Sequence, residues 1–270
     1  MQSEHEYLQK YRIGDYERPS LTTDVAAFTI RSEQNDNYKR NADKKLSILL
    51  IRRGKHPFLG FWALPGGFLR PGETVEACAL REITEETHIT PVSLLPIGVF
   101  SEPGRDPRGW IISNAFASVI GEDSVKQIGD DDASDAQWFD VSFTKDDGED
   151  CHLELRCESV VLNAVLRESQ TRFGRTYFEI KDSGGLAFDH ARIIATALTA
   201  LREGAKNFEM IFDFLPETFT LTALQKVQET IMNISILPAN FRRKISDYVV
   251  ETDEYVLGAG HRPAKLYRRK

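Results

Sequence analysis

One short stretch, GFLRPGETVEACALREITEETHI at residues 67–89, constrains the fold of this chain more than any other. Its second half, residues 74–87, has the composition of a helix. At about 100° per residue, Glu82, Glu85 and Glu86 fall within an arc of about 100° and project as one carboxylate cluster. Like charges this close destabilise a helix unless a cation sits among them, and hard divalent ions prefer oxygen ligands. The residues alone therefore predict either a metal site or a solvated acidic helix face.

The metal interpretation also suits a particular reaction, the hydrolysis of a diphosphate. Metal ions can bridge phosphate oxygens, offset developing charge and activate a water, while one carboxylate acts as base. The sequence just ahead, LPGGFLRPGE at residues 64–73, supplies glycines that let the backbone approach a metal or a phosphate closely.

The full stretch resembles the Nudix box, which reads Gly, five residues, Glu, seven residues, Arg-Glu, an aliphatic residue, any residue, Glu-Glu, any residue, Gly, aliphatic. The matching positions are Gly67, Glu73, Arg81, Glu82, Ile83, Glu85, Glu86 and Ile89. One position departs from the pattern, because His88 stands where glycine is expected. In the family that glycine ends the helix in a left-handed conformation. Histidine tolerates positive φ better than most residues, and Pro91 follows as a stop signal, so we expect modest strain, no lost ligand and a helix-ending rather than a catalytic His88.

The resemblance implies an α/β fold, a Nudix α/β/α sandwich with a mixed sheet, and Mg²⁺ or Mn²⁺ as cofactor. The implied metal ligands are Glu82, Glu85, Glu86 and the backbone carbonyl of Gly66. Glu82 is also the candidate base, and Arg81 pairs with Glu73 to hold the loop against the helix. Many enzymes of this kind recruit a further acid from a distant loop. The candidates here are Asp131, Asp132 and Glu149, among which the sequence does not choose.

Four further segments resemble the Nudix subgroup that includes ADP-ribose hydrolases and Nudix-related transcriptional regulators. They are IRRGKHPFLGFWALPGGF (51–68), SEPGRDPRG (101–109), GDDDASDAQWF (129–139) and LAFDHARIIATAL (186–198). ADP-ribose or another nucleoside diphosphate sugar is therefore the expected ligand. Arg105 and Arg108 offer planar donors to a diphosphate, and Trp62 or a nearby aromatic residue stacks on adenine. Alternatively, the two arginines form surface ion pairs with Asp106 and Glu102.

The order of predicted elements divides the chain into two domains. Runs rich in β-branched and aromatic residues predict strands at residues 21–30, 45–53, 92–100, 110–120, 151–157 and 175–182, and residues 158–165 fit a strand or a short helix. Residues 189–203 carry a helical stripe of apolar side chains, with Asp189 placed to cap its start. We place the boundary just after this helix. Residues 1–206 then form the Nudix domain, including an N-terminal extension over 1–20, and residues 207–270 form the second domain.

The second domain differs from the first in charge. The chain carries a net charge of −7, but residues 238–270 hold 8 basic residues against 4 acidic ones. A capping-box pattern at Thr222 and Gln225 opens one predicted helix, and Pro238 suits the first turn of the next. Two strand-like segments around GAGHRP complete the order helix, helix, hairpin, which is that of a winged helix.

A basic helix beside a basic wing can place one element in the major groove and the other against phosphates. The segment resembles the C-terminal domain of the Nudix-related transcriptional regulators, particularly at NFRRK (240–244) and HRPAKLYR (261–268). The implied DNA-binding residues are Arg242, Arg243, Lys244, Arg262 and Lys265. Without the resemblance, DNA binding and a small dimerisation or docking module fit the residues equally well.

We therefore expect a bifunctional homodimer, in which a Mg²⁺-dependent hydrolase of ADP-ribose-like compounds is fused to a winged helix that binds double-stranded DNA and regulates transcription in response to the ligand. The alternatives are a non-catalytic ADP-ribose-sensing repressor, or a plain hydrolase whose C-terminal domain only dimerises. No apolar run approaches the roughly 20 residues of a membrane span, so we expect a cytoplasmic protein with no membrane partner. Three cysteines without metal-type spacing predict neither a disulfide framework nor a zinc site.

Overall fold

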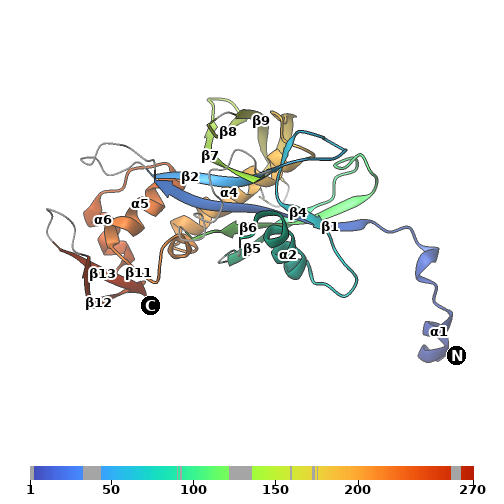
Figure 1. The fold of residues 1–270 in the computed structure, drawn as a ribbon, viewed down its shortest axis with the longest axis horizontal. Coiled ribbons are helices and arrows are strands. Elements are labelled where there is room, and N and C mark those ends of the chain that lie inside the picture. Colours follow the sequence, from blue (N-terminus) through green and yellow to red (C-terminus); the bar gives the residue numbers. More distant parts are fainter. Residues whose placement is uncertain are drawn as a thin grey trace.

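A large mixed sheet forms the centre of the computed structural model, which describes residues 3–32, 44–89, 91, 93–121, 136–158, 160–171, 174, 176–256 and 263–270 (Figure 1). Its strand order is β10-β9-β8-β7-β2-β1-β6-β5, with β3 paired to β2 and β4 paired to β1. The strands are β1 (Ser20–Ser32), β2 (Lys44–Arg52), β3 (Trp62–Ala63), β4 (Gly66–Phe68), β5 (Ser93–Phe100), β6 (Ile111–Val119), β7 (Ala136–Lys145), β8 (Asp150–Arg156), β9 (Val161–Gln170) and β10 (Thr176–Asp182). β1 runs parallel to β6, whereas the other paired strands in the described sheet are antiparallel.

Two helices cover opposite faces of this sheet, α2 (Val75–Thr87) and α4 (His190–Lys206). Successive side chains of a strand point to opposite faces. Accordingly, Val25 and Ala27 of β1 join the apolar cluster under α2, and Ala26 and Phe28 join the cluster under α4. This arrangement confirms the predicted α/β/α sandwich.

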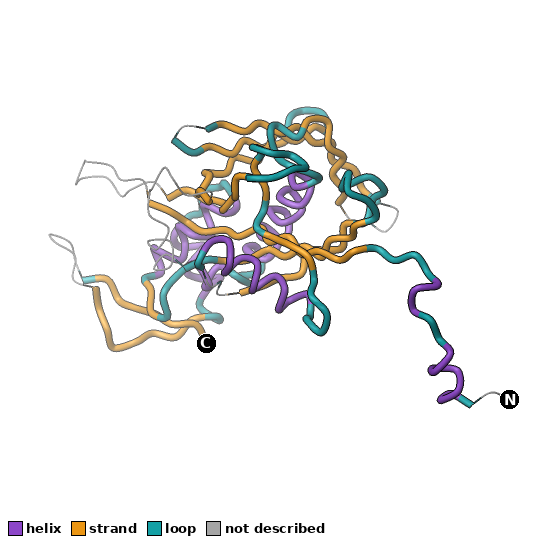
Figure 2. Tube along the Cα trace, turned by 45° about the vertical axis from the view of Figure 1, so that its right-hand side comes forward, coloured by secondary structure: helices purple, strands orange, loops and turns teal. Residues whose placement is uncertain are grey.

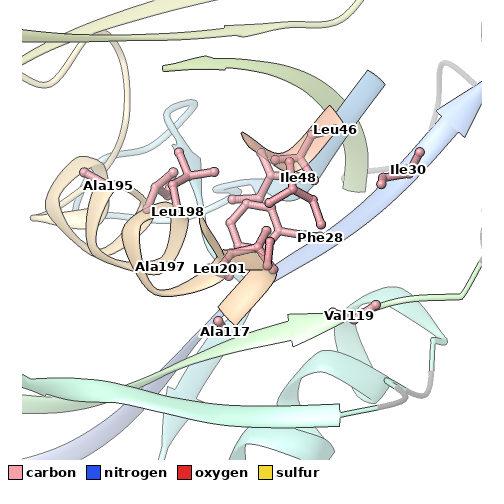
Figure 3. Packing of buried hydrophobic residues seen from close by; sticks show 14 of the residues in the cluster. Phe28, Ile30, Leu46, Ile48, Ala117, Val119, Ala195, Ala197, Leu198 and Leu201 are labelled. Atoms are coloured by element: carbon pink, nitrogen blue, oxygen red, sulfur yellow. The ribbon is translucent and has the colours of Figure 1, made fainter. Parts of the chain in front are cut away.

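Helix α4 is held on the sheet by apolar packing. Figure 3 shows Leu198 and Leu201 of α4 close to Phe28 of β1 and Ile48 of β2, and each of these four side chains is at most 1% exposed. Full burial of one such side chain contributes about 1.5–3 kcal/mol. The stripe predicted from the sequence is therefore the face by which α4 binds the sheet, and the helix extends three residues beyond the predicted end at residue 203.

The C-terminal part has the predicted winged-helix order. Its elements are η2 (Ile211–Phe214), β11 (Thr218–Phe219), α5 (Leu221–Met232), α6 (Pro238–Ile245), β12 (Val249–Val256) and β13 (Ala264–Arg269), and the small sheet is ordered β11-β13-β12. The predicted capping box is wrong, because Thr222 lies inside α5. The hydroxyl of Thr220, two residues earlier, accepts the hydrogen bond from the amide of Ala223.

One apolar cluster runs through both parts of the chain. It includes Phe28 and Leu201 together with Leu224 of α5 and Phe241 of α6, all at most 1% exposed. Helix α4 ends at Lys206, and the domain boundary placed there stays a prediction.

The N-terminal segment lies apart from both parts. Figures 1 and 2 show α1 (Glu4–Lys10) and η1 (Ile13–Asp15) extending away from the sheet, and none of their residues is buried. Among the helices in the described ranges, none is long and apolar enough to cross a lipid bilayer.

Replacing Leu201 with alanine tests the packing of α4. Leu201 is fully buried, so Leu201→Ala should lower the free energy of unfolding by about 2–5 kcal/mol in urea denaturation. Leu8→Ala makes the same chemical change at a side chain that is 60% exposed, and its effect should stay within about 0.5 kcal/mol. Equal losses in the two variants would contradict this account.

Candidate functional site

Helix α2 begins and ends as its sequence predicts. The hydroxyl of Thr74 accepts a hydrogen bond from the amide of Ala77 and caps the start. His88 ends the helix in the left-handed region at φ 59° and ψ 17°, and its amide donates to the carbonyl of Thr84. Histidine thus adopts the conformation that glycine supplies at this position of the motif, as predicted.

Two glycines allow β4 to lie against both β1 and α2. A Cβ atom on Gly66 would collide with the carbonyl oxygen of Thr23, and one on Gly67 would collide with the carboxyl group of Glu82. Glycine is required at Gly66, where the clash is with backbone, whereas a side chain at Gly67 would displace the carboxyl group of Glu82.

Arg81 connects the carboxylates of α2 to the loop before the helix. Its Nε lies 2.7 Å from Oε1 of Glu73, its Nη1 contacts Glu82, and the same nitrogen lies 3.3 Å from Oε2 of Glu85. The hydrogen bonds from Arg81 and from the amide of Arg70 lower the pKa of Glu73 to about 2. The structure therefore contains the expected Arg81–Glu73 pair. Arg81 also forms ion pairs with Glu82 and Glu85, which are two of the expected metal ligands.

Glu86 is in a different electrostatic position from its neighbours. Its carboxylate accepts a hydrogen bond of 2.9 Å from the amide of Gly66, and no residue in the described ranges forms an ion pair with it. Glu86 is exposed as a residue and lines the hollow described below. Desolvation of the carboxyl group, with repulsion from Glu82 and Asp24, raises its pKa to about 7.

Glu82, Glu85 and Glu86 were expected to project as one carboxylate cluster, but the structure holds them apart. Among the described residues, no group of three or more His, Cys, Asp or Glu side chains is placed to hold a metal ion together. Arg81 binds Glu82 and Glu85, and Arg70 also lies 3.4 Å from Glu85. The donor set still fits a hard divalent cation, because it consists of oxygen atoms and includes one carboxylate, Glu86, that lacks a cationic partner in the described structure.

Glu86 opens into a hollow of about 130 Å³, here called the α2 hollow. Its lining residues are Thr22, Asp24, Ile51, Arg53, Leu64, Gly66, Gly67, Phe68, Glu86, Arg105, Asp106, Arg108, Phe188 and His190. The guanidinium carbons of Arg53 and Arg108 lie 4.7 and 5.4 Å from the ring centroid of Phe188. Two cations beside one aromatic ring form a surface that suits an anionic ligand with a planar group.

Sequence reasoning did not identify Arg53 and Phe188 as site residues. Phe188 has φ 52°, which is unusual for a bulky residue and is typical of functional positions. Both residues lie in segments that resemble the ADP-ribose subgroup, and that was the one signal available. Their meeting depends on the residue after β2 lying beside the segment that precedes α4.

Arg105 lines the hollow, but its guanidinium is bound to carboxylates of the protein itself. It forms a bidentate pair with Asp189, at 2.6 and 3.0 Å, and its Nη2 lies 3.4 Å from Asp24. Its side chain is 5% exposed, so its ion pair is buried and differs from the predicted surface pair, while its diphosphate-binding role stays a prediction. Asp189 consequently makes no side-chain cap for α4, which corrects the predicted capping role. Arg108 is 40% exposed and pairs with Asp106 at 2.7 Å.

Asp24, which lines the hollow, makes polar contacts with several neighbouring side chains. It accepts a hydrogen bond from the hydroxyl of Ser113, and Nε2 of His190 lies 3.4 Å away. Burial alone would raise the pKa of Asp24, but His190, Ser113 and Arg105 outweigh burial and lower it to about 2. Asp24 therefore remains ionised and is part of the field that Glu86 experiences.

Trp62 does not face the hollow, which corrects its predicted stacking role. It is 7% exposed, belongs to the core under α4 and packs edge-on against Phe139 at 4.8 Å. The nearby aromatic residues that do line the hollow are Phe68 and Phe188.

The loop acids remain without an assigned role. Asp131 and Asp132 lie outside the described residues. Glu149, in the turn before β8, is exposed and is not part of the lining of the α2 hollow.

The winged helix carries a second exposed basic surface. Arg242, Arg243 and Lys244 are exposed on α6, while Phe241 and Ile245 bury its other face. Lys265 on β13 lies 2.6 Å from a carboxylate oxygen of Glu251, a surface pair of the kind that exchanges readily. Arg262 lies outside the described residues.

Comparison with known proteins identifies both parts. The chain matches the NUDIX domain family over residues 36–152 and the NrtR DNA-binding winged helix domain family over residues 211–269. It is 30% identical to the ADPR responsive transcriptional repressor NtrR of Acinetobacter baylyi over 270 residues, which covers 98% of this chain and 88% of that protein. It is 48% identical to the ADP-ribose pyrophosphatase of Methanocaldococcus jannaschii over 101 residues, 37% of this chain and 58% of the relative.

The fold agrees with these matches. The structure superposes on that of Shewanella oneidensis NrtR complexed with a 27mer DNA with a TM-score of 0.63 and 26% identity, covering 93% of each chain. A Nudix domain joined to a winged helix defines a class of regulatory proteins. This chain belongs to the Nudix superfamily and, within it, to the family of Nudix-related transcriptional regulators.

The raised pKa of Glu86 predicts how stability depends on pH. A carboxyl group whose folded pKa lies above its ordinary value of 4.5 supplies stability at low pH, and that stability is lost as pH rises through about 7. Glu86→Gln should therefore raise the thermal unfolding midpoint more at about pH 8 than at about pH 5, measured by calorimetry without divalent ions. Glu76→Gln, at an exposed site on the same helix, should show no such difference. The idea fails if the two variants behave alike.

Proposed function

We propose that this protein hydrolyses ADP-ribose or a related nucleoside diphosphate sugar with the help of a divalent cation, and that the same ligand controls DNA binding by the winged helix. The observation that carries the proposal is the α2 hollow, where Glu86 has no ion-pair partner in the described structure and shares the lining with Arg53 and Arg108. A site that contains both a carboxylate without a cationic partner and two arginines suits a metal together with an anionic ligand.

The two named relatives support the choice of ligand. The relative that aligns with nearly the whole of this chain is named as responsive to ADPR, and the archaeal relative is named as an ADP-ribose pyrophosphatase. In this chain Arg53 and Arg108 would bind the diphosphate, and Phe188, in contact with both, would place an aromatic ring beside a sugar or base.

The residues of α2 would do the chemistry. Glu82, Glu85, Glu86 and the carbonyl of Gly66 would hold Mg²⁺ or Mn²⁺. When bound, such an ion supplies charge stabilisation to the phosphate oxygens and lowers the pKa of water. Glu82 and Glu85 must exchange contacts with Arg81 to take part, while Glu73 keeps that arginine in place. Glu86 ligates only when ionised, so turnover should increase as pH rises through about 7.

A sensor without turnover is the second candidate. It is favoured by the arginine contacts of Glu82 and Glu85, which leave the described carboxylates apart in this conformation. A receptor needs affinity for the ligand but no activated water. Both candidates share the hollow and differ in whether product forms.

The winged helix would bind duplex DNA through α6. Arg242, Arg243 and Lys244 would contact the major groove or its phosphates, together with Lys265 on β13. Arg262 stays a predicted DNA-binding residue. Winged-helix proteins commonly bind paired half-sites as dimers, and we infer a homodimer here. A cytoplasmic location stays a prediction.

Hydrolysis is tested by following AMP release from ADP-ribose with Mg²⁺ or Mn²⁺ by chromatography. Wild-type protein should form AMP, and Glu86→Gln should reduce kcat by about 100-fold or more because the metal loses a ligand and its charge. Glu76→Gln on the same helix should keep wild-type activity. Absence of product from wild-type protein that still binds ADP-ribose in calorimetry would leave only the sensor.

DNA binding is tested by measuring affinity for the DNA upstream of its own gene at several salt concentrations. Arg242→Ala with Arg243→Ala should weaken binding and reduce the slope of log affinity against log salt by about 1.8, which is about 0.9 for each phosphate that the protein no longer neutralises. Arg156→Ala with Arg167→Ala removes two exposed arginines from β8 and β9 and should change neither. An unchanged slope in the α6 variant would reassign the domain to dimerisation.

A further inference from the structure

Helix α4 is in contact with both functional parts of the molecule. Its first residue, His190, lines the α2 hollow. Near its other end the carbonyl of Ala205 accepts a buried hydrogen bond of 2.7 Å from the side-chain amide of Gln228 in α5. Figure 1 shows α4 along the large sheet, and α4 also contacts α5 of the winged helix. One element of 17 residues therefore reaches from the ligand site to the DNA-binding domain.

At the hollow, α4 is tied to the segment that carries the site. Nδ1 of His190 accepts a hydrogen bond of 2.8 Å from the amide of Leu64, two residues before Gly66. The ring proton then lies on Nε2, which faces Asp24 at 3.4 Å. The preceding residue, Asp189, holds Arg105 in two hydrogen bonds. A ligand that shifts Glu86, Arg105 or the Leu64–Gly66 backbone must also shift the start of α4.

At the other end, α4 is tied to both domains through Arg202. Its Nη2 donates to the carbonyl of Phe143 in β7 at 3.0 Å, and its Nε donates to the carbonyl of Ile231 in α5 at 3.4 Å. Its guanidinium lies 5.4 Å from the Phe143 ring centroid. No carboxylate in the described residues forms an ion pair with it, and burial lowers its pKa. This cation is stabilised by backbone oxygens of both parts, and such hydrogen bonds weaken steeply when the geometry changes.

The strands are less suited than α4 to carry a displacement. β1 and β2 also run from the hollow toward α5, but β1 is hydrogen-bonded to β2 and β6, and β2 to β1 and β7. Helix α4 rests on the sheet through apolar side chains such as Leu198 and Leu201 (Figure 3). A packed helix can slide by small shear movements that a paired strand cannot make.

We infer that α4 couples occupancy of the α2 hollow to the DNA affinity of the winged helix, with His190 as the positioning residue at the ligand end and Arg202 as the positioning residue at the DNA-binding end. This inference rests on the proposed function, because it presupposes that the ligand alters DNA binding. The inference adds that α4, with His190 and Arg202, transmits the effect of ligand binding to the winged helix.

The test measures a coupling ratio, the affinity for the upstream DNA with saturating ADP-ribose divided by the affinity without it. Allosteric ratios are typically about 5–150-fold. In Arg202→Met the ratio should fall to within about twofold of one, while ADP-ribose affinity and ligand-free DNA affinity each stay within about threefold of wild type. Arg202→Lys retains the charge but not the forked donors, so its ratio should lie between those of wild type and Arg202→Met.

Lys206→Met is the matched control. Lys206 lies one turn further along α4 and pairs with Glu203 of the same helix, so its removal should leave the ratio unchanged. A wild-type ratio in both Arg202 variants would overturn the role of α4 while leaving ligand-controlled DNA binding in place. A wild-type ratio of one would instead show that the proposed regulation is absent, and the inference would fall with it.

Discussion

A buried network of one arginine and two aspartates is the interaction on which the rest of this structure depends. It joins three elements. Arg105 comes from the loop between β5 and β6, Asp24 from β1 and Asp189 from the residue before α4, and all three are almost inaccessible to solvent. Removing one partner from such a set leaves an uncompensated buried charge and typically costs about 3–5 kcal/mol. The network fixes the start of α4 beside the hollow. It also sets the negative potential, from Asp24, in which Glu86 titrates.

Several negatively charged side chains lie close together on α2, and their mutual repulsion would destabilise the helix if nothing offset it. Arg81 offsets Glu73, Glu82 and Glu85, and the proton that Glu86 retains up to about pH 7 offsets the remaining repulsion. Both devices are reversible, since an arginine contact can be exchanged and a proton can be released when a metal ion arrives. In this arrangement the like charges of α2 are offset by Arg81 and a proton, and a bound cation would take the place of these contacts.

The two parts of the chain share a core, and this has consequences for regulation. Apolar side chains of β1, α4, α5 and α6 belong to one cluster. The winged helix is therefore packed against the Nudix domain. Movements between packed elements are small and discrete. A ligand at the hollow can then influence DNA binding through α4 without unfolding any segment.

The sequence by itself determined the elements whose signals are local. The residues of 74–87 predicted α2, and the resemblance of residues 67–89 to the Nudix box implied the left-handed end at His88, the Arg81–Glu73 pair and the sandwich. The order of helix, helix and hairpin predicted the winged helix. Tertiary structure decided the partners of residues far apart in the chain. Arg105 is paired with Asp189, Trp62 is buried in the core, and Arg53 meets Phe188 at the hollow. Local patterns report on backbone conformation and burial within a few residues, whereas these contacts arise from the order of strands and the placement of α4, which no short stretch of sequence encodes.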